Sequence, residues 1–225
     1  MTEQAKLTTA DGAELPGFLK TPEGGGGPGA VVLLHEWWGL TDQVRGVAAR
    51  LAREGFTVFA PDLYRGQVAK EPAEAQKLMS EMDRQRAVED IARAVDALQR
   101  RAPGTKVAVL GFCMGGALTL AAAAALDGRV AAAVPFYGIP AEGTADLTKI
   151  RCPVLGHFAN IDDWCTPERV DALERKLKGA GVPLELHRYD AGHAFFNEQR
   201  PEVYSPQNAE RAWTRTVEFL RAKLG

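Results

Sequence analysis

Cys113 is the residue of this sequence whose setting most favours chemistry. It lies in the segment 111–116 (GFCMGG), between a strand-like apolar run at Lys106 to Leu110 and an Ala/Leu-rich run of helical type at Ala117 to Leu126. Gly-x-Cys-x-Gly between a strand and a helix has the form of a nucleophile elbow, in which a sharp turn lifts one side chain above a sheet. Glycines there leave room for neighbouring backbone. The alternative is a small cysteine buried in a turn, since free cysteines are usually apolar core residues.

Two aspartates and a histidine follow later strand-like runs and could complete a catalytic set with this thiol. Asp162 and Asp163 come after the run at 154–158, and His193 follows the run at 184–189. The chain order is therefore nucleophile, acid, histidine, which is the order of α/β-hydrolases and differs from two protease orders. The histidine would accept the thiol proton and later protonate the leaving group, and an aspartate on its other ring nitrogen would fix its tautomer. Asp162 and Asp163 compete for this role. One of them would instead be a helix cap or a solvated charge.

The loop after the strand-like run at 30–35 supplies another carboxylate and a candidate oxyanion donor. Glu36 and Trp37 begin this loop, and Met114 directly follows the cysteine. The backbone N–H groups of Trp37 and Met114 are expected to bind the oxyanion. A thiol is a weak nucleophile until it ionises, and both a helix N-terminus and a nearby imidazolium favour the thiolate.

The elements that must position these residues alternate between strands and helices. Segments 6–9 and 15–21 flank Asp11-Gly12, a favourable tight turn, so an antiparallel hairpin is expected to open the sheet. Further strands are expected at 30–35, 56–60, 106–110, 130–136, 154–158 and 184–189, and helices at 42–53, 72–82, 84–101, 117–126, 167–178 and 207–224. The alternation predicts one α/β domain over residues 1–225, with a mostly parallel sheet and helices on both faces. Ligands bind at the carboxyl ends of such strands, where the candidate residues gather.

Composition and charge narrow the class of protein. The chain has 225 residues, enough to bury a core, and 46% of them are hydrophobic. A formal net charge of -2 gives no reason to expect a nucleic-acid partner. No apolar run approaches the ~18 residues that span a bilayer, and the sequence starts without a signal-peptide pattern. We therefore expect cytoplasmic residence and no membrane partner.

Three cysteines are an odd number without the spacing of a disulfide framework. This favours a reducing compartment and leaves at least one free thiol. Cys165 is expected near the site, whereas Cys152 is expected to be buried and inert. No His, Cys or Asp spacing indicates a metal site, and no cofactor is expected. Moderate charge and the lack of an exposed apolar segment favour a monomer.

Taken together, the motifs resemble the dienelactone hydrolase (carboxymethylenebutenolidase) family within the α/β-hydrolase superfamily. The resemblance runs from about Thr9 to the C-terminus and rests on the segments 35–39 (HEWWG), 60–64 (APDLY), 111–116 (GFCMGG) and 192–195 (GHAF). It implies an α/β-hydrolase fold and hydrolysis of a small activated ester or lactone through an acyl-thioester intermediate.

The resemblance also assigns roles to residues of this chain. It implies a catalytic triad of Cys113, His193 and Asp162, with Glu36 holding the thiol and ionising it when substrate enters. Four further residues in or beside the motifs are expected to wall the substrate pocket: Tyr64, Phe195, Trp38 and Asn197.

This sequence departs from relatives that act on the chlorocatechol-pathway lactone. Those relatives carry a carboxylate-gripping arginine shortly after the histidine, where this chain has Ala194 to Asn197. Candidates for a second gripping arginine are Arg65, Arg84 and Arg86. Dienelactone itself is therefore not the expected substrate.

Three other functions remain open from sequence. A thioesterase or amidase would use the same residues with a differently shaped pocket. A thiol redox or sensor protein would pair Cys113 with Cys165, and a non-catalytic binding module would keep only the fold. A complete set of nucleophile, base and acid argues against the binding module.

Overall fold

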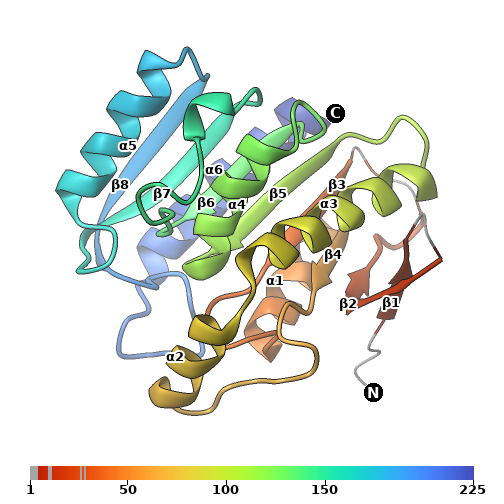
Figure 1. Ribbon diagram of the computed structural model, residues 1–225, viewed down its shortest axis with the longest axis horizontal. Coiled ribbons are helices and arrows are strands. Elements are labelled where there is room, and N and C mark those ends of the chain that lie inside the picture. The colour runs from red at the N-terminus through yellow and green to blue at the C-terminus, as the bar shows by residue number, and fades with distance from the viewer. Residues whose placement is uncertain (1–4, 10–11, 26, 28) are drawn as a thin grey trace.

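In the described part of the chain, a sheet of eight strands organises the protein (Figure 1). The computed structural model describes residues 5–9, 12–25, 27 and 29–225. The strand order across the sheet is β1-β2-β4-β3-β5-β6-β7-β8. The strands are β1 (Ala5–Thr8), β2 (Glu14–Lys20), β3 (Ala30–Leu34), β4 (Thr57–Pro61), β5 (Val107–Phe112), β6 (Ala132–Phe136), β7 (Val154–Ile161) and β8 (Leu184–Gly192).

The predicted N-terminal hairpin and mostly parallel sheet are confirmed. β1 pairs antiparallel with β2, and β2 pairs antiparallel with β4. The remaining neighbours, from β4 to β8, run parallel. Asp11 of the predicted turn lies outside the described residues. Gly12 has a φ of 79°, a backbone conformation that glycine adopts at little cost.

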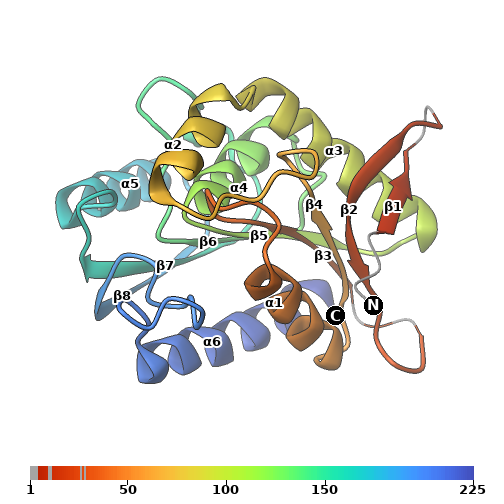
Figure 2. The same cartoon turned by 90° about the horizontal axis from the view of Figure 1, so that it is seen from below.

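Helices cover both faces of the sheet, which completes the predicted α/β-hydrolase fold. Figure 2 shows α1 and α6 on one face and α2, α3, α4 and α5 on the other. The helices are α1 (Asp42–Arg53), α2 (Pro72–Glu81), α3 (Arg84–Arg101), α4 (Met114–Ala125), α5 (Pro167–Gly179) and α6 (Pro206–Leu224), and a short 3-10 turn, η1, spans Leu147–Lys149. None of the helices in the described ranges combines the length and apolar character needed to cross a membrane.

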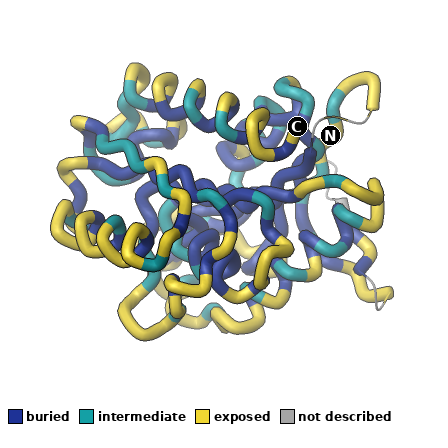
Figure 3. The backbone as a smooth tube through the Cα atoms, turned by 90° about the horizontal axis from the view of Figure 1, so that it is seen from above, coloured by how far each residue is buried: buried dark blue, intermediate teal, exposed yellow. Residues whose placement is uncertain are grey.

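Each face of the sheet has its own hydrophobic core, and strand alternation divides the residues between them. In β3, Val31 and Leu33 pack with the helices α1 and α6, whereas Val32 and Leu34 pack with α3 and α4. Because both faces are covered, the central strands are continuously apolar rather than alternating. Figure 3 shows the backbone of these strands buried and the outer turns of the helices exposed.

Several elements extend beyond their predicted ends, and these extensions lie at the carboxyl edge of the sheet. α4 begins at Met114 rather than at Ala117. β7 continues to Ile161 and β8 to Gly192, past the predicted ends at 158 and 189. The last two residues of β7 are exposed, so no apolar pattern marks them in the sequence. The candidate residues therefore follow directly from the tips of the strands.

Candidate active site

Cys113 alone joins β5 to α4, in a strained turn. Its φ is 53° and its ψ is −115°, a conformation that side-chain-bearing residues rarely adopt. The neighbouring backbone is too close for larger residues: a Cβ on Gly115 would lie 2.6 Å from the carbonyl oxygen of Leu34. A Cβ on Gly116 would lie 2.5 Å from the carbonyl oxygen of Phe136. The glycines of the motif thus allow α4 to start against the backbone of β3 and β6.

The thiol, the imidazole and one carboxylate form a continuous chain of hydrogen bonds. His193 Nε2 lies 3.2 Å from Cys113 Sγ, and His193 Nδ1 lies 2.7 Å from Asp162 Oδ2. The other oxygen of Asp162 accepts hydrogen bonds from the backbone N–H groups of Trp164 at 2.7 Å and Cys165 at 2.9 Å. Asp162 is thus fixed from both sides. Asp163, the competing candidate, is exposed.

Burial and hydrogen bonding act in opposite directions on Asp162. Burial favours the protonated acid, but the hydrogen bond and charge of His193, with the two backbone N–H groups, outweigh it. The pKa of Asp162 is therefore held below its usual value, and the group is a carboxylate at neutral pH. Since an ionised carboxylate accepts only, His193 Nδ1 carries the proton and Nε2 is free to accept one from the thiol.

Glu36 lies buried beneath the same site and is held by two donors. The hydroxyl of Tyr137 donates to Glu36 Oε1 at 3.2 Å, and Asn197 Nδ2 donates to Glu36 Oε2 at 2.7 Å. Burial raises the pKa of Glu36, while Asn197, His193 and Tyr137 oppose the rise. Burial, followed by the negative charge of Glu36, also raises the pKa of Cys113. Cys113 is therefore a neutral thiol in this structure.

The two candidate oxyanion donors lie at the ends of β3 and β5. Met114 supplies the first N–H of α4, which has no partner within the helix, and this N–H favours the thiolate of Cys113. Trp37 lies in the loop after β3, which His35 anchors. The backbone N–H of Leu63 donates to His35 Nε2 at 3.3 Å, so the Nδ1 proton donates to the carbonyl oxygen of Glu36 at 2.6 Å. Burial lowers the pKa of His35, which keeps the ring neutral.

Cys113 and His193 open into a cleft of about 810 Å³ on the α4 side of the sheet. Its other walls come from α2, α3, the loop after β6 and the segment after β7. The lining includes Met79, Met82, Val88, Ala117, Leu118, Ala121, Tyr137, Ile139, Trp164 and Cys165. Trp164 is 56% exposed and packs edge-on against Trp37, with the ring centroids 6.0 Å apart.

The four residues expected to wall the substrate pocket are not among the residues that line this cleft. Phe195 is fully buried and packs on Tyr137 in the core beneath the site. The side-chain amide of Asn197 donates its hydrogen bond to Glu36. Trp38 contacts Trp37 and the guanidinium of Arg200 instead of the cleft. These side chains therefore lie beneath or beside the site, with Phe195 and Asn197 buried and Trp38 half-buried.

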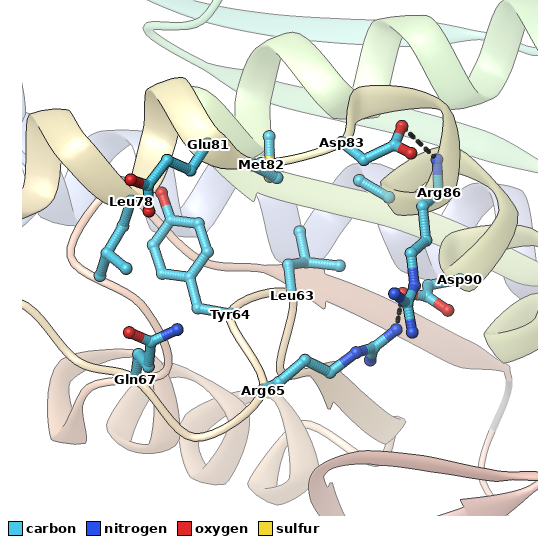
Figure 4. Close-up of a pocket in the computed structure, with 11 residues that line it drawn as sticks. Leu63, Tyr64, Arg65, Gln67, Leu78, Glu81, Met82, Asp83, Arg86 and Asp90 are labelled. Atoms are coloured by element: carbon cyan, nitrogen blue, oxygen red, sulfur yellow. Dashed lines mark hydrogen bonds and ion pairs between the residues drawn. The ribbon is translucent and has the colours of Figure 1, made fainter.

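Tyr64 lines a second, smaller pocket of about 230 Å³ (Figure 4). Its hydroxyl donates to Met114 Sδ at 3.2 Å. Two of the three arginines considered for gripping a carboxylate also belong there. Arg65 is paired with the buried Asp90, and Arg86 lies on the same wall. The third, Arg84, lines the larger cleft.

Sequence reasoning missed Tyr137, which contacts both Glu36 and His193. Besides its bond to Glu36, its ring packs edge-on against His193 at 5.1 Å between centroids. Its φ is 35°, a second strained position at the site. Tyr137 directly follows β6, so the search for polar residues after strand ends would have found it.

The remaining cysteines and histidines differ in their surroundings. Cys152 is buried in the core, and Cys165 lines the cleft. His157 is buried between Tyr189 and Thr216, and His187 lies on Glu185. Among the described residues, no group of three or more His, Cys, Asp or Glu side chains is arranged to hold a metal ion.

Comparison with known proteins agrees with this fold. The model of the dienelactone hydrolase family matches residues 15–224. "Protein usf" of Aquifex pyrophilus is 38% identical over 223 residues, covering 95% of this chain and 96% of that protein. The carboxymethylenebutenolidase of Rhodococcus opacus is 34% identical over 226 residues, covering 92% and 86% of the two chains.

Solved structures show the same architecture. A dienelactone hydrolase-like promiscuous phosphotriesterase from metagenomic libraries is similar with a TM-score of 0.86 and 26% identity, over 99% of both chains. Matches of this length and identity extend over the sheet, the elbow and the histidine loop together. The chain therefore belongs to the dienelactone hydrolase family of carboxylic-ester hydrolases.

Proposed function

We propose that the protein hydrolyses activated esters or lactones with Cys113 as the nucleophile. The observation that carries the proposal is the continuous chain of contacts from Cys113 Sγ through His193 to Asp162, at 3.2 Å and 2.7 Å, beside an open cleft. A nucleophile within hydrogen-bond reach of a base that a third group orients is the arrangement required for covalent catalysis. The name of the Rhodococcus opacus relative, carboxymethylenebutenolidase, supports a lactone or ester as substrate.

Acylation begins when the thiol proton moves to His193 Nε2 and Sγ attacks the substrate carbonyl carbon. The N–H groups of Met114 and Trp37 stabilise the oxyanion that forms. The tetrahedral intermediate then collapses, the C–O bond to the leaving group breaks, and His193 donates its proton to the departing oxygen. The product of this half-reaction is a thioester on Cys113 and a free alcohol or enol; for a lactone, the hydroxyl stays attached to the acyl chain.

Deacylation repeats these steps with water. His193 accepts a proton from water, the resulting hydroxide attacks the thioester carbonyl, and the C–S bond breaks. The proton returns to sulfur, so the acid product leaves and the neutral thiol is restored. In both half-reactions the carboxylate of Asp162 stabilises the positive charge on the His193 imidazolium, because Asp162 stays ionised.

Glu36 keeps the nucleophile protonated between turnovers. Its buried charge is among the causes that raise the pKa of Cys113. A neutral thiol resists oxidation and alkylation, since the thiolate is the reactive form. We propose that substrate entry changes this balance, so that Cys113 ionises only when a carbonyl is in place. The described cysteines are free thiols, which fits a reducing compartment such as the cytoplasm.

The test compares wild type with Cys113→Ala on p-nitrophenyl acetate and on a simple butenolide lactone. Cys152→Ala is the matched control, because this thiol is buried outside the cleft. We expect Cys113→Ala to lose at least a hundredfold in kcat/KM and the control to stay within about threefold. Mass spectrometry of the quenched wild type should show an acetyl adduct on Cys113. A Cys113→Ala variant of full activity would refute the proposal. Hydrolysis of thioesters or amides in preference to esters would show that the substrates are thioesters or amides rather than esters or lactones.

A further inference from the structure

The cleft beside Cys113 extends well beyond the reacting atoms. From the elbow it follows the surface of α4, where it is lined by Ala117, Leu118, Ala121, Ala124 and Ala125. At 1.5 Å per residue, the stretch from Ala117 to Ala125 is about 12 Å long. The volume of about 810 Å³ lies in the upper part of the range for sites that hold drug-sized ligands. A small lactone at Cys113 would leave most of this space empty.

The floor of the cleft offers no polar side chain. Of the six α4 residues that line it, four are alanines and the other two are Met114 and Leu118. A ligand with polar groups along its length would lose hydrogen bonds to water there without regaining them from the floor. Alanines also keep the floor low and even, so an unbranched chain can lie flat along it.

The walls are apolar and adaptable. Met79 and Met82 come from α2 and its end, and Val88 comes from α3; these three are partly buried and pack against the main core cluster. Ile139 and Ala145 line the cleft from the loop after β6. Methionine side chains adjust to chains of different length. Charged side chains, among them Lys149 and Glu89, occur only at exposed positions of the lining.

Resting on the hydrolase function above, we propose that the preferred substrates are esters with a linear aliphatic acyl arm, and that this arm lies along α4. The leaving-group oxygen must face His193 Nε2, which protonates it. The other substituent of the carbonyl carbon is the acyl arm, and it is directed away from His193 into the apolar part of the cleft. Alanines 117, 121 and 125, spaced one turn apart, successively contact more distant carbons of the arm.

The first test is a chain-length series with the full protein: p-nitrophenyl acetate, butyrate, hexanoate, octanoate and decanoate. Complete burial of one methylene is worth about a fourfold gain, so we expect kcat/KM to rise two- to fourfold per added methylene up to about octanoate. A parallel series of alkyl acetates, extended on the alcohol side, should show no such rise. A kcat/KM that falls steadily from acetate overturns the proposal, and a rise confined to the alcohol series overturns the assignment to the acyl arm.

The second test places a leucine at each turn of the helix. Each leucine should block the cleft at its own turn, so the optimum of the acyl series should be shortest for Ala117→Leu, longer for Ala121→Leu and longest for Ala125→Leu. The ratio of octanoate to acetate turnover should fall at least tenfold in Ala117→Leu and Ala121→Leu, the variants nearest the cysteine. Ala222→Leu on α6, on the opposite face of the sheet, is the matched control and should leave the series unchanged. Optima that do not follow position along α4 would overturn the proposal.

Failure of the two proposals can be told apart. If Cys113→Ala retains ester hydrolysis, the proposed function fails and the chain-length series carries no meaning. If hydrolysis depends on Cys113 but ignores acyl length, only the aliphatic arm is refuted. Thermal denaturation of each leucine variant separates misfolding from a blocked cleft, because a folded variant keeps the wild-type midpoint within a few degrees.

Discussion

Removing one hydroxyl from Tyr137 should reveal how the buried carboxylate of Glu36 is supported. Tyr137→Phe keeps the ring, which is fully buried and packs against His193, Phe112 and Phe195. It loses the hydrogen bond that the hydroxyl donates to Glu36 Oε1, 3.2 Å long, and the hydrogen bond that the hydroxyl oxygen accepts from the backbone N–H of Phe196. A hydrogen bond to a charged group contributes about 1.5–3 kcal/mol, and a bond of this length belongs at the lower end.

The loss should depend on pH, with a sign that the structure determines. Burial raises the pKa of Glu36 in the folded protein above its ordinary 4.5, so the folded state retains the proton to higher pH than the unfolded chain does. Stability therefore falls as pH rises from about 4.5 through the folded-state pKa. Without the Tyr137 hydroxyl that pKa rises further. The loss of stability in the variant should be smallest near pH 4.5 and about 1.5 kcal/mol larger once Glu36 is ionised in both proteins, because only the hydrogen bond to Glu36 depends on the charge of this carboxylate.

Urea denaturation of wild type and variant between pH 4.5 and pH 8.5 measures this difference. Tyr204→Phe is the control, since Tyr204 is half-buried in the loop before α6 and its change should give a flat difference. A Tyr137→Phe difference that is independent of pH, or that is largest at low pH, would refute the reasoning. A rise in the rate of Cys113 alkylation with the same pH profile would indicate that Glu36 charge also governs the thiol.

Three further changes test neighbouring parts of the structure. Gly138→Ala would place a Cβ 2.1 Å from the carbonyl oxygen of Cys113 and should lower the unfolding free energy by about 1–3 kcal/mol. Gly179→Ala, at an open helical position, is the control and should be neutral or stabilising. Thermal denaturation measures both variants. Asp162→Asn should lower kcat by roughly a hundredfold or more, and Asp163→Asn by less than about threefold; equal effects would contradict the assignment of the acid. Burial holds the pKa of His157 well below 6.5, so stability should be lost as pH falls below that value, and His157→Gln should flatten the loss in acid denaturation curves.

The sequence predicted the fold well because the signals are local and repeated. Continuous apolar runs marked the strands covered on both faces, and the 3.6-residue period marked helices such as α1 and α3, whose bounds were predicted to within a residue. The start of α4 was placed three residues late. Glycines disfavour a helix on intrinsic propensity, so Gly115 and Gly116 were left outside the predicted helix. In the structure they belong to α4, because only glycine allows the helix to approach the backbone of β3 and β6 so closely. Such contact between distant segments leaves no local signal.

The positions of Cys113, His193 and Asp162 in the candidate site were predictable, and the residues that wall the cleft were not. Cys113, His193 and Asp162 each follow a strand end, so the topology alone brought them to one edge of the sheet. Whether a side chain after such an end points into the cleft or back into the core depends on one or two backbone angles. Phe195 therefore lies in the core, whereas Ile139, unmarked by any motif, lines the cleft.

Strain at the site is held by hydrogen bonds that continue the sheet into its loops. Cys113 and Tyr137 both have positive φ, at a cost of about 1–3 kcal/mol each. The N–H of Cys113 donates to the carbonyl oxygen of Phe136 at 3.0 Å, and the N–H of Tyr137 donates to that of His157 at 2.7 Å. Each strained residue thus makes the last backbone hydrogen bond between two neighbouring parallel strands. The position of Cys113 depends on backbone contacts, so an added methyl group at Gly138 should disturb it more than removal of the Tyr137 hydroxyl.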